Sequence, residues 1–190
     1  MILLVRHAEH DLLGRALAGR MPGVGLNALG RAQAERLARL DVAAIQSSPL
    51  ERARETALPL ARRLGLPVET VEALNEIDFG VWQGRSFADL DADPVWHDWN
   101  RDRARTRPPG GESMTEVQAR IVGHLRRLTA ERRPVVLFSH GDVIKAALLH
   151  VLGLPLDAVS RIEVDPAGIS TVALGEWGAK LVALNERLVP

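Results

Sequence analysis

The stretch Leu3-Leu4-Val5-Arg6-His7-Ala8-Glu9 joins a short apolar run directly to an arginine and a histidine. The run from Ile2 to Val5 contains no polar residue, which predicts a strand buried on both faces of a largely parallel sheet. In open α/β sheets, ligands bind beyond the carboxyl ends of the strands, where Arg6 and His7 stand. The pair is typical of anion capture beside a nucleophile or proton carrier, although a strand-end ion pair with a solvated histidine would show the same pattern.

The bulk composition narrows the class of protein. A length of 190 residues fits one domain with a sizeable core. The formal net charge is zero, which argues against binding to nucleic acid. The chain has no cysteine, so disulfides and thiolate chemistry are excluded. Because the N-terminal apolar run is too short for a signal peptide and no run could span a membrane, we expect a cytoplasmic protein without membrane contact.

A second informative segment follows a short strand predicted over Val42 to Ser47. Here Ser48-Pro49-Leu50-Glu51 has the spacing of a capping box, so Ser48 is predicted to cap a helix whose first position is Pro49. The N-terminus of a helix favours anions. Arg52 in the first turn can point into the same crevice as the first arginine, unless it is a solvated helix arginine.

A second histidine repeats the setting of the first. Pro134 to Ser139 is predicted as an apolar strand, and His140-Gly141-Asp142 follows it at the start of a helix that runs through Leu152. Gly141 there allows close approach of the backbone to a ligand. The other predicted elements are helices from Asn27 to about Leu40, after Asp93-Pro94 and after Ser113, an edge strand at Val68 to Val71, and a hairpin of Ile169 to Leu174 with Lys180 to Leu184.

Residues 85 to 112 look like an excursion over the sheet edge. Its tryptophans, Trp96 and Trp99, are predicted to pack in the core rather than to stack on a substrate. Its four alternating arginines form either a solvated basic segment or a lid that contacts an anionic substrate. They are Arg101, Arg103, Arg105 and Arg107.

Together these signals place Arg6, His7, Arg52 and His140 at one sheet edge, and by hypothesis Glu76, which lies in a stretch predicted as a loop. Two arginines can grip phosphate oxygens, one histidine can attack phosphorus, and the other can stabilise the charge. A carboxylic acid can protonate the leaving oxygen. No P-loop or carboxylate cluster for magnesium is visible, so positive charge must come from side chains.

In combination, the motifs resemble those of the histidine phosphatase superfamily, the phosphoglycerate-mutase-like proteins, and especially its small bacterial phosphatases and probable phosphomutases. The likeness covers nearly the whole chain. It is carried by Arg6-His7-Ala8, Ser47 to Ala57, Leu74 to Gly84, Pro109 to Ser113 and Ser139 to Gly141. The resemblance implies a three-layer α/β/α sandwich on a six-stranded, mostly parallel sheet with one antiparallel strand. We expect one domain over residues 1–190, with a short cap excursion at about 85–112.

The resemblance also implies roles for individual residues. His7 would become the phosphohistidine, and Glu76 would be the acid that later activates water. The implied catalytic residues are His7, Glu76 and His140, and the implied phosphate ligands are Arg6, Arg52 and Gly141. We expect no cofactor and no metal, and the expected partner is a small phosphorylated substrate.

Two positions depart from the family pattern. Ala8 replaces the usual glycine after the catalytic histidine. Many members also place an asparagine that contacts phosphate where this chain has Leu13, which cannot donate a hydrogen bond. A shortened loop would let Arg20 take over that contact, so Arg20 is a further candidate for binding phosphate.

The expected function is hydrolysis of a small phosphomonoester by a metal-independent histidine (acid-type) phosphatase. A phosphoglycerate-mutase-type phosphomutase shares the first half-reaction, but it needs an extensive cap to keep water from the phosphohistidine. The stretch between Glu76 and His140 must also hold a long helix and a strand, which leaves few residues for such a cap. Hydrolysis is therefore favoured over phosphoryl transfer between two positions of one substrate. Less favoured alternatives are a non-catalytic phospholigand-binding protein and a metal site at His7 and His10.

Overall fold

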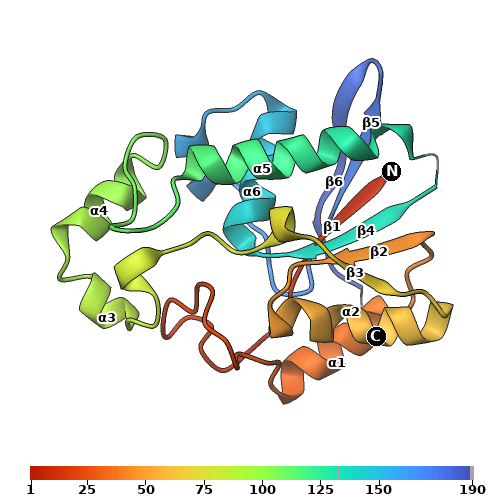
Figure 1. Ribbon diagram of the computed structural model, residues 1–190, viewed down its shortest axis with the longest axis horizontal. Coiled ribbons are helices and arrows are strands. Elements are labelled where there is room, and N and C mark those ends of the chain that lie inside the picture. Colours follow the sequence, from red (N-terminus) through yellow and green to blue (C-terminus); the bar gives the residue numbers. More distant parts are fainter. Residues whose placement is uncertain (132, 189–190) are drawn as a thin grey trace.

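A six-stranded sheet lies at the centre of the computed structural model, which describes residues 1–131 and 133–188 (Figure 1). The strands are β1 (Ile2–Arg6), β2 (Ala44–Ser47), β3 (Val68–Thr70), β4 (Val135–Ser139), β5 (Ile169–Gly175) and β6 (Gly178–Glu186). Their order is β3-β2-β4-β1-β5-β6, and β5 runs antiparallel to both of its neighbours while the other pairs are parallel. The predicted sheet with one antiparallel strand is therefore confirmed.

Helices cover both faces of the sheet, as Figure 1 shows. One layer holds α1 (Ala28–Leu37) and α2 (Glu51–Leu64), and the other holds α5 (Met114–Arg127) and α6 (Gly141–Leu152). Short 3₁₀ turns are η1 (Glu72–Leu74), η2 (Gly80–Trp82), η3 (Leu128–Ala130) and η4 (Leu156–Arg161). The three-layer α/β/α prediction is confirmed. No helix of the described residues has both the length and the apolar composition to cross a membrane.

The two central strands show why the sheet needs both layers. Successive side chains of a strand point to opposite faces. Leu4 and Leu137 accordingly join the core under α5 and α6, whereas Val5 and Phe138 join the core under α1 and α2. Every residue of β4 is buried. The continuous apolar runs of the sequence therefore correspond to strands buried on both faces.

The start of α2 differs from the prediction. The helix begins at Glu51, and its N-cap residue Leu50 makes no side-chain cap, so the predicted capping box at Ser48 is wrong. The Ser48 hydroxyl instead accepts a hydrogen bond from the Leu50 amide at 3.3 Å and lies 2.8 Å from Nε2 of His140. The serine is thus a neighbour of His140 rather than a helix cap. Helix α1 keeps its predicted Asn27 cap but ends at Leu37, short of Leu40.

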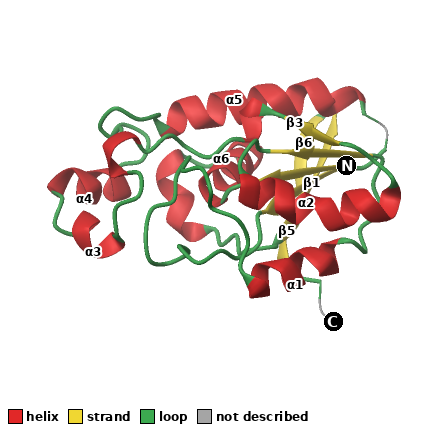
Figure 2. Ribbon diagram, turned by 60° about the horizontal axis from the view of Figure 1, so that its bottom comes forward, coloured by secondary structure: helices red, strands yellow, loops and turns green. Residues whose placement is uncertain are grey.

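The segment of residues 85–112 carries α3 (Phe87–Leu90) and α4 (Pro94–Arg101). Both views place these helices beyond one end of the sheet (Figures 1 and 2). Trp96 and Trp99 are buried and pack against Trp82 with ring centroids 5.3 and 5.8 Å away, so the prediction that they pack is confirmed. Their edge-to-face geometry is favourable for aromatic rings.

The base of this segment closes on itself. The Val81 amide donates to the Pro109 carbonyl at 3.1 Å, and the Glu112 amide donates to the Asp78 carbonyl at 2.7 Å. Gly80 has φ +53°, and a Cβ there would lie 2.2 Å from the Pro109 carbonyl oxygen. Only glycine combines this left-handed backbone with such a close approach.

Candidate active site

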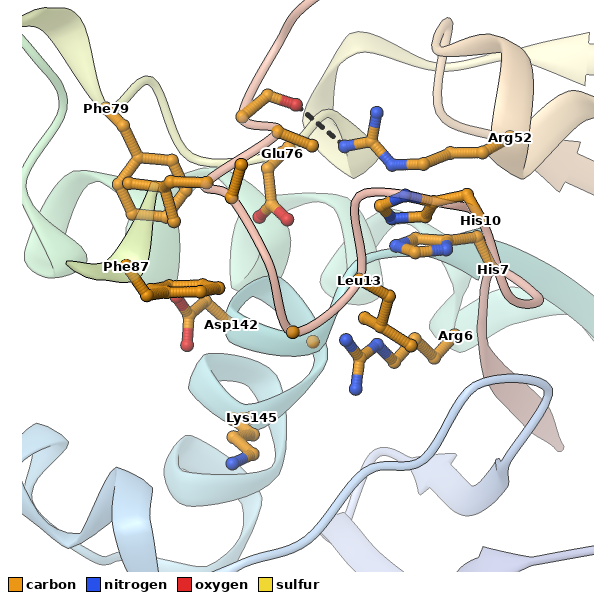
Figure 3. A pocket seen from close by; sticks show the side chains of 16 residues that line it. Arg6, His7, His10, Leu13, Arg52, Glu76, Phe79, Phe87, Asp142 and Lys145 are labelled. Carbon is orange, nitrogen blue, oxygen red and sulfur yellow. Dashed lines mark hydrogen bonds between the residues drawn. The ribbon is translucent and has the colours of Figure 1, made fainter. Parts of the chain in front are cut away.

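A pocket of about 200 Å³ lies where β1 ends, beside the N-terminus of α6 (Figure 3). Its labelled lining residues are Arg6, His7, His10, Leu13, Arg52, Glu76, Phe79, Phe87, Asp142 and Lys145. The pocket therefore combines cationic, titratable and aromatic side chains from the N-terminal loop, α2, the segment after η1 and α6.

His7 is the buried histidine directly after β1. Its amide donates to the Ser139 carbonyl at 2.9 Å, which ties it to the end of β4. Its Nδ1 lies 2.8 Å from the Ala8 carbonyl oxygen, which only accepts hydrogen bonds, so we assign the ring proton to Nδ1 and a free lone pair to Nε2. Burial, with Arg52 and Arg6 nearby, holds the pKa of His7 well below its usual value. The ring is therefore an uncharged potential nucleophile.

The two pocket arginines are fixed by backbone carbonyls but keep unused donors. Arg6 donates from one terminal nitrogen to the Val164 carbonyl at 2.7 Å, and Arg52 donates likewise to the Gly19 carbonyl at 2.7 Å. Nε of Arg6, and both Nε and the other terminal nitrogen of Arg52, have no partner among the described residues. Buried donors are rarely left unpaired. These N–H groups are thus available to an anion.

His140 lies beneath the pocket with no exposed surface, its ring centre 5.1 Å from that of His7. A terminal nitrogen of Arg52, which only donates, lies 3.3 Å from Nδ1 of His140. Nδ1 therefore accepts, and Nε2–H donates to the Ser48 hydroxyl at 2.8 Å. Burial, then Arg52 and His7, keep the pKa of His140 well below its usual value.

Glu76 follows η1, and 13% of its side chain is exposed. One oxygen accepts a hydrogen bond from the Ile77 amide at 2.9 Å, and the other lies 3.7 Å from Nδ1 of His140. Burial and the negative charge of Asp142 raise the pKa of Glu76 to about 7, against the opposing effect of Arg52. The group can therefore hold a proton at a pH where His7 is already neutral.

Gly141 and Arg20, two further predicted phosphate ligands, differ in their position relative to the pocket. Gly141 lines the pocket, and a Cβ there would lie 3.5 Å from the guanidinium carbon of Arg6. Arg20 is not among the residues that line this pocket, and its role as a phosphate ligand stays a prediction. Its Nε donates to the Glu76 carbonyl at 2.7 Å, and a terminal nitrogen donates to Glu112 at 3.0 Å. These contacts tie the guanidinium to the loop that carries Glu76.

Sequence reasoning missed His10, Phe87, Asp142 and Lys145 as pocket residues. Asp142 had a usable signal, because it directly follows His140-Gly141 in the first turn of a helix. His10 was weighed only as a partner of His7 at a metal. Among residues 1–131 and 133–188, no group of three or more His, Cys, Asp or Glu side chains is arranged to hold a metal ion.

An open α/β sheet with arginines and neutral histidines at its carboxyl edge defines a protein that binds an anion there. The chain belongs to the histidine phosphatase superfamily (branch 1), whose family description matches residues 2–187. This membership confirms the resemblance inferred from the motifs.

Individual relatives and a solved structure are similar to this chain over most of its length. A bifunctional protein of Mycobacterium tuberculosis is 36% identical over 192 residues, which cover 96% of this chain and 52% of that protein. The chain thus spans about half the length of that relative. Glucosyl-3-phosphoglycerate phosphatase of M. tuberculosis is 35% identical over 175 residues, covering 82% of this chain and 76% of the relative. The crystal structure of α-ribazole phosphatase from Shigella flexneri has a TM-score of 0.87 at 26% identity, covering 100% of this chain and 98% of the other.

The effect of Asp142 on Glu76 can be tested directly. The Asp142→Asn variant removes a negative charge that opposes ionisation of Glu76, so the pKa of Glu76 should fall below about 7. NMR titration of the Glu76 carboxyl carbon, assigned with Glu76→Gln, measures it. Asp41→Asn, at an exposed position ahead of β2, is the control and should leave the titration midpoint in place. An unchanged midpoint in Asp142→Asn would contradict the assignment.

Proposed function

We propose that this protein hydrolyses small phosphomonoesters through a phosphohistidine at His7. One observation carries the proposal: unpaired N–H groups of Arg6 and Arg52 surround a pocket that also holds an uncharged histidine with a free Nε2 lone pair. A phosphate group has oxygens for the arginines and an electrophilic phosphorus for the histidine. The relatives named as phosphatases support this class of reaction.

In the first step, Nε2 of His7 attacks phosphorus, so an N–P bond forms while the bond from phosphorus to the leaving oxygen breaks. Glu76, protonated up to about pH 7, gives its proton to that oxygen and releases an alcohol. In the second step, water attacks phosphorus and gives a proton to the Glu76 carboxylate. The N–P bond breaks, inorganic phosphate leaves, and both residues return to their starting states.

The remaining residues act on the phosphoryl oxygens. Arg6 and Arg52 present their free N–H groups to the charge that the oxygens carry in the transition state. His140 orients Arg52 by accepting a hydrogen bond from its terminal nitrogen at Nδ1. Gly141 leaves room for the phosphoryl group beside Arg6. We propose that residues 85–112 act as a short cap that contributes Phe87 to the pocket wall.

The substrate class follows from the pocket and the relatives. Its small volume fits a phosphorylated metabolite, and several relatives are named for such substrates, among them glucosyl-3-phosphoglycerate and α-ribazole phosphate esters. The arginines supply positive charge, so we propose that hydrolysis needs no metal. A cytoplasmic location and the absence of nucleic-acid and membrane partners stay predictions from the sequence.

Covalent catalysis at His7 is the first prediction here. Rapid alkaline quenching of the enzyme with a phosphorylated substrate should trap acid-labile phosphate on His7, because an N–P bond is stable to base. His7→Ala should form no such adduct and lose several orders of magnitude in turnover. His97→Ala, at an exposed histidine on α4, should behave as wild type. Near wild-type turnover by His7→Ala would refute the mechanism.

Metal independence gives a second prediction. Because guanidinium groups provide the electrostatic stabilisation, dialysis against EDTA should leave kcat/KM unchanged. A phosphatase with a known bound metal, treated in parallel, controls for effective chelation. Loss of activity that a divalent ion restores would show that the proposal omits a metal.

Glu76→Gln tests the proton donor. An alkyl alkoxide leaves poorly without a proton, whereas nitrophenolate leaves largely unaided. The variant should therefore lose most of ~10²–10⁴-fold in kcat/KM with alkyl phosphates, and much less with p-nitrophenyl phosphate. In the wild type, kcat/KM for alkyl phosphates should fall above about pH 7 as Glu76 loses its proton.

The comparison rests on kcat/KM or the single-turnover rate of His7 phosphorylation, because Glu76 also serves the second step. Equal losses with both substrates would mean that Glu76 holds the pocket together and that the proton comes from another group.

A further inference from the structure

His10 is a buried pocket residue that the proposed steps do not use. It lies on the loop after β1 with only 5% of its surface exposed. Its ring centre is 5.1 Å from that of His7. Figure 3 shows the two imidazoles one above the other beside the side chain of Arg52, both directed toward Glu76.

Several buried nitrogens of the pocket lack hydrogen-bond partners. Six buried side-chain nitrogens lack a hydrogen-bond partner among the described residues, and four of the six belong to His10, Arg6 and Arg52. His10 contributes Nδ1. A buried polar atom without a partner costs free energy, so such atoms are rare unless a ligand completes them. The same anion that satisfies the arginines is the natural partner for His10.

The donor inventory of the pocket points to the same residue. Leu13, on the same loop, cannot donate, and Arg20 is held by Glu112 outside the pocket. Beyond Arg6, His7 and Arg52, the lining residues within the described chain include only two with side-chain N–H donors, His10 and Lys145. Figure 3 shows Lys145 on α6, on the side of Asp142, whereas His10 adjoins the nucleophile.

We infer that His10 binds the phosphoryl group of the substrate, its uncharged imidazole donating a hydrogen bond to a non-bridging oxygen. This inference rests on the proposed function for the identity of the ligand. Burial, with Arg52 and Arg6 nearby, lowers the pKa of His10 to about 4, so the ring is neutral at physiological pH. A neutral donor adds a hydrogen bond without adding a third positive charge beside the arginines.

Binding of inorganic phosphate, measured by titration calorimetry on the full chain, tests the inference independently of turnover. A hydrogen bond to a charged group is worth ~1.5–3 kcal/mol, so His10→Leu should weaken phosphate binding by ~10- to 100-fold. His10→Gln keeps an N–H donor and should lose much less. Leu13→Asn added to His10→Leu should recover part of the loss, because it returns a donor to the same loop.

The controls separate binding from folding. His124→Leu removes another buried histidine, one that is bonded to Gln46 far from the pocket, and should leave phosphate affinity unchanged. In the unmodified chain, the ring nitrogen-15 resonances of His10 should shift on addition of phosphate. Unshifted resonances, unchanged affinity in a folded His10→Leu, or equal losses in the Leu and Gln variants would each overturn the inference.

The two proposals can also fail separately. Phosphate binding that depends on His10, in a protein that hydrolyses no phosphomonoester, would refute the proposed function and support the role of His10. Hydrolysis with a phosphohistidine at His7, but with phosphate binding and kcat/KM unaffected by His10→Leu, would support the function and refute the inference.

Discussion

The burial of the Arg52 guanidinium beside that of Arg6 is the constraint on which the pocket depends. Removing a cation from water is costly, and a second cation nearby adds repulsion. Burial and Arg6 accordingly lower the pKa of Arg52, while Glu76 raises it. Burial, together with these two charges, keeps the pKa values of His7 and His140 low and their rings neutral. The pocket therefore has excess positive charge that an anionic ligand would neutralise. The buried histidines stay neutral partly because protonating them would add to this excess.

The sheet holds the arginines and histidines of the pocket in fixed positions. Parallel pairing of β1 with β4 sets Arg6 opposite Ser139, so the histidine that follows each strand emerges at the same edge. The turn after β2 then brings Arg52 to that edge from the start of α2. Three separate parts of the sequence are therefore brought to one edge by the backbone hydrogen bonds of the sheet.

The predictions of strands and helices succeeded where residues close together in the sequence determine the structure. The apolar runs before Arg6 and His140 admit little except buried strands, and Asn27 caps its helix as expected. Ser48 was misjudged because the capping-box pattern is local, whereas the hydroxyl is used by His140, which is remote in sequence.

Contacts between residues remote in sequence also explain which pocket residues the sequence did not predict. The contacts of Arg20 could not be predicted from the sequence because its carboxylate partner, Glu112, lies far along the chain. Asp142 and His10 were overlooked for a related reason. Asp142 acts on Glu76, which is remote in sequence, and the short spacing from His7 to His10 does not by itself show that the second ring enters the pocket.

The backbone contact between Gly80 and Pro109 has an evolutionary consequence. Since the two ends of the intervening chain are hydrogen-bonded at their base, that chain behaves as a closed loop anchored outside the sheet. The entropy of closing a loop grows only slowly with its length. Because Leu90, Trp96 and Trp99 pack in the same core cluster as Ile2 and Leu4, changes between these anchors would be tolerated best at the exposed positions of the segment. Substitutions there, Phe87 in the pocket wall included, can change what enters the pocket without altering the strands that carry Arg6 and His7 to its floor.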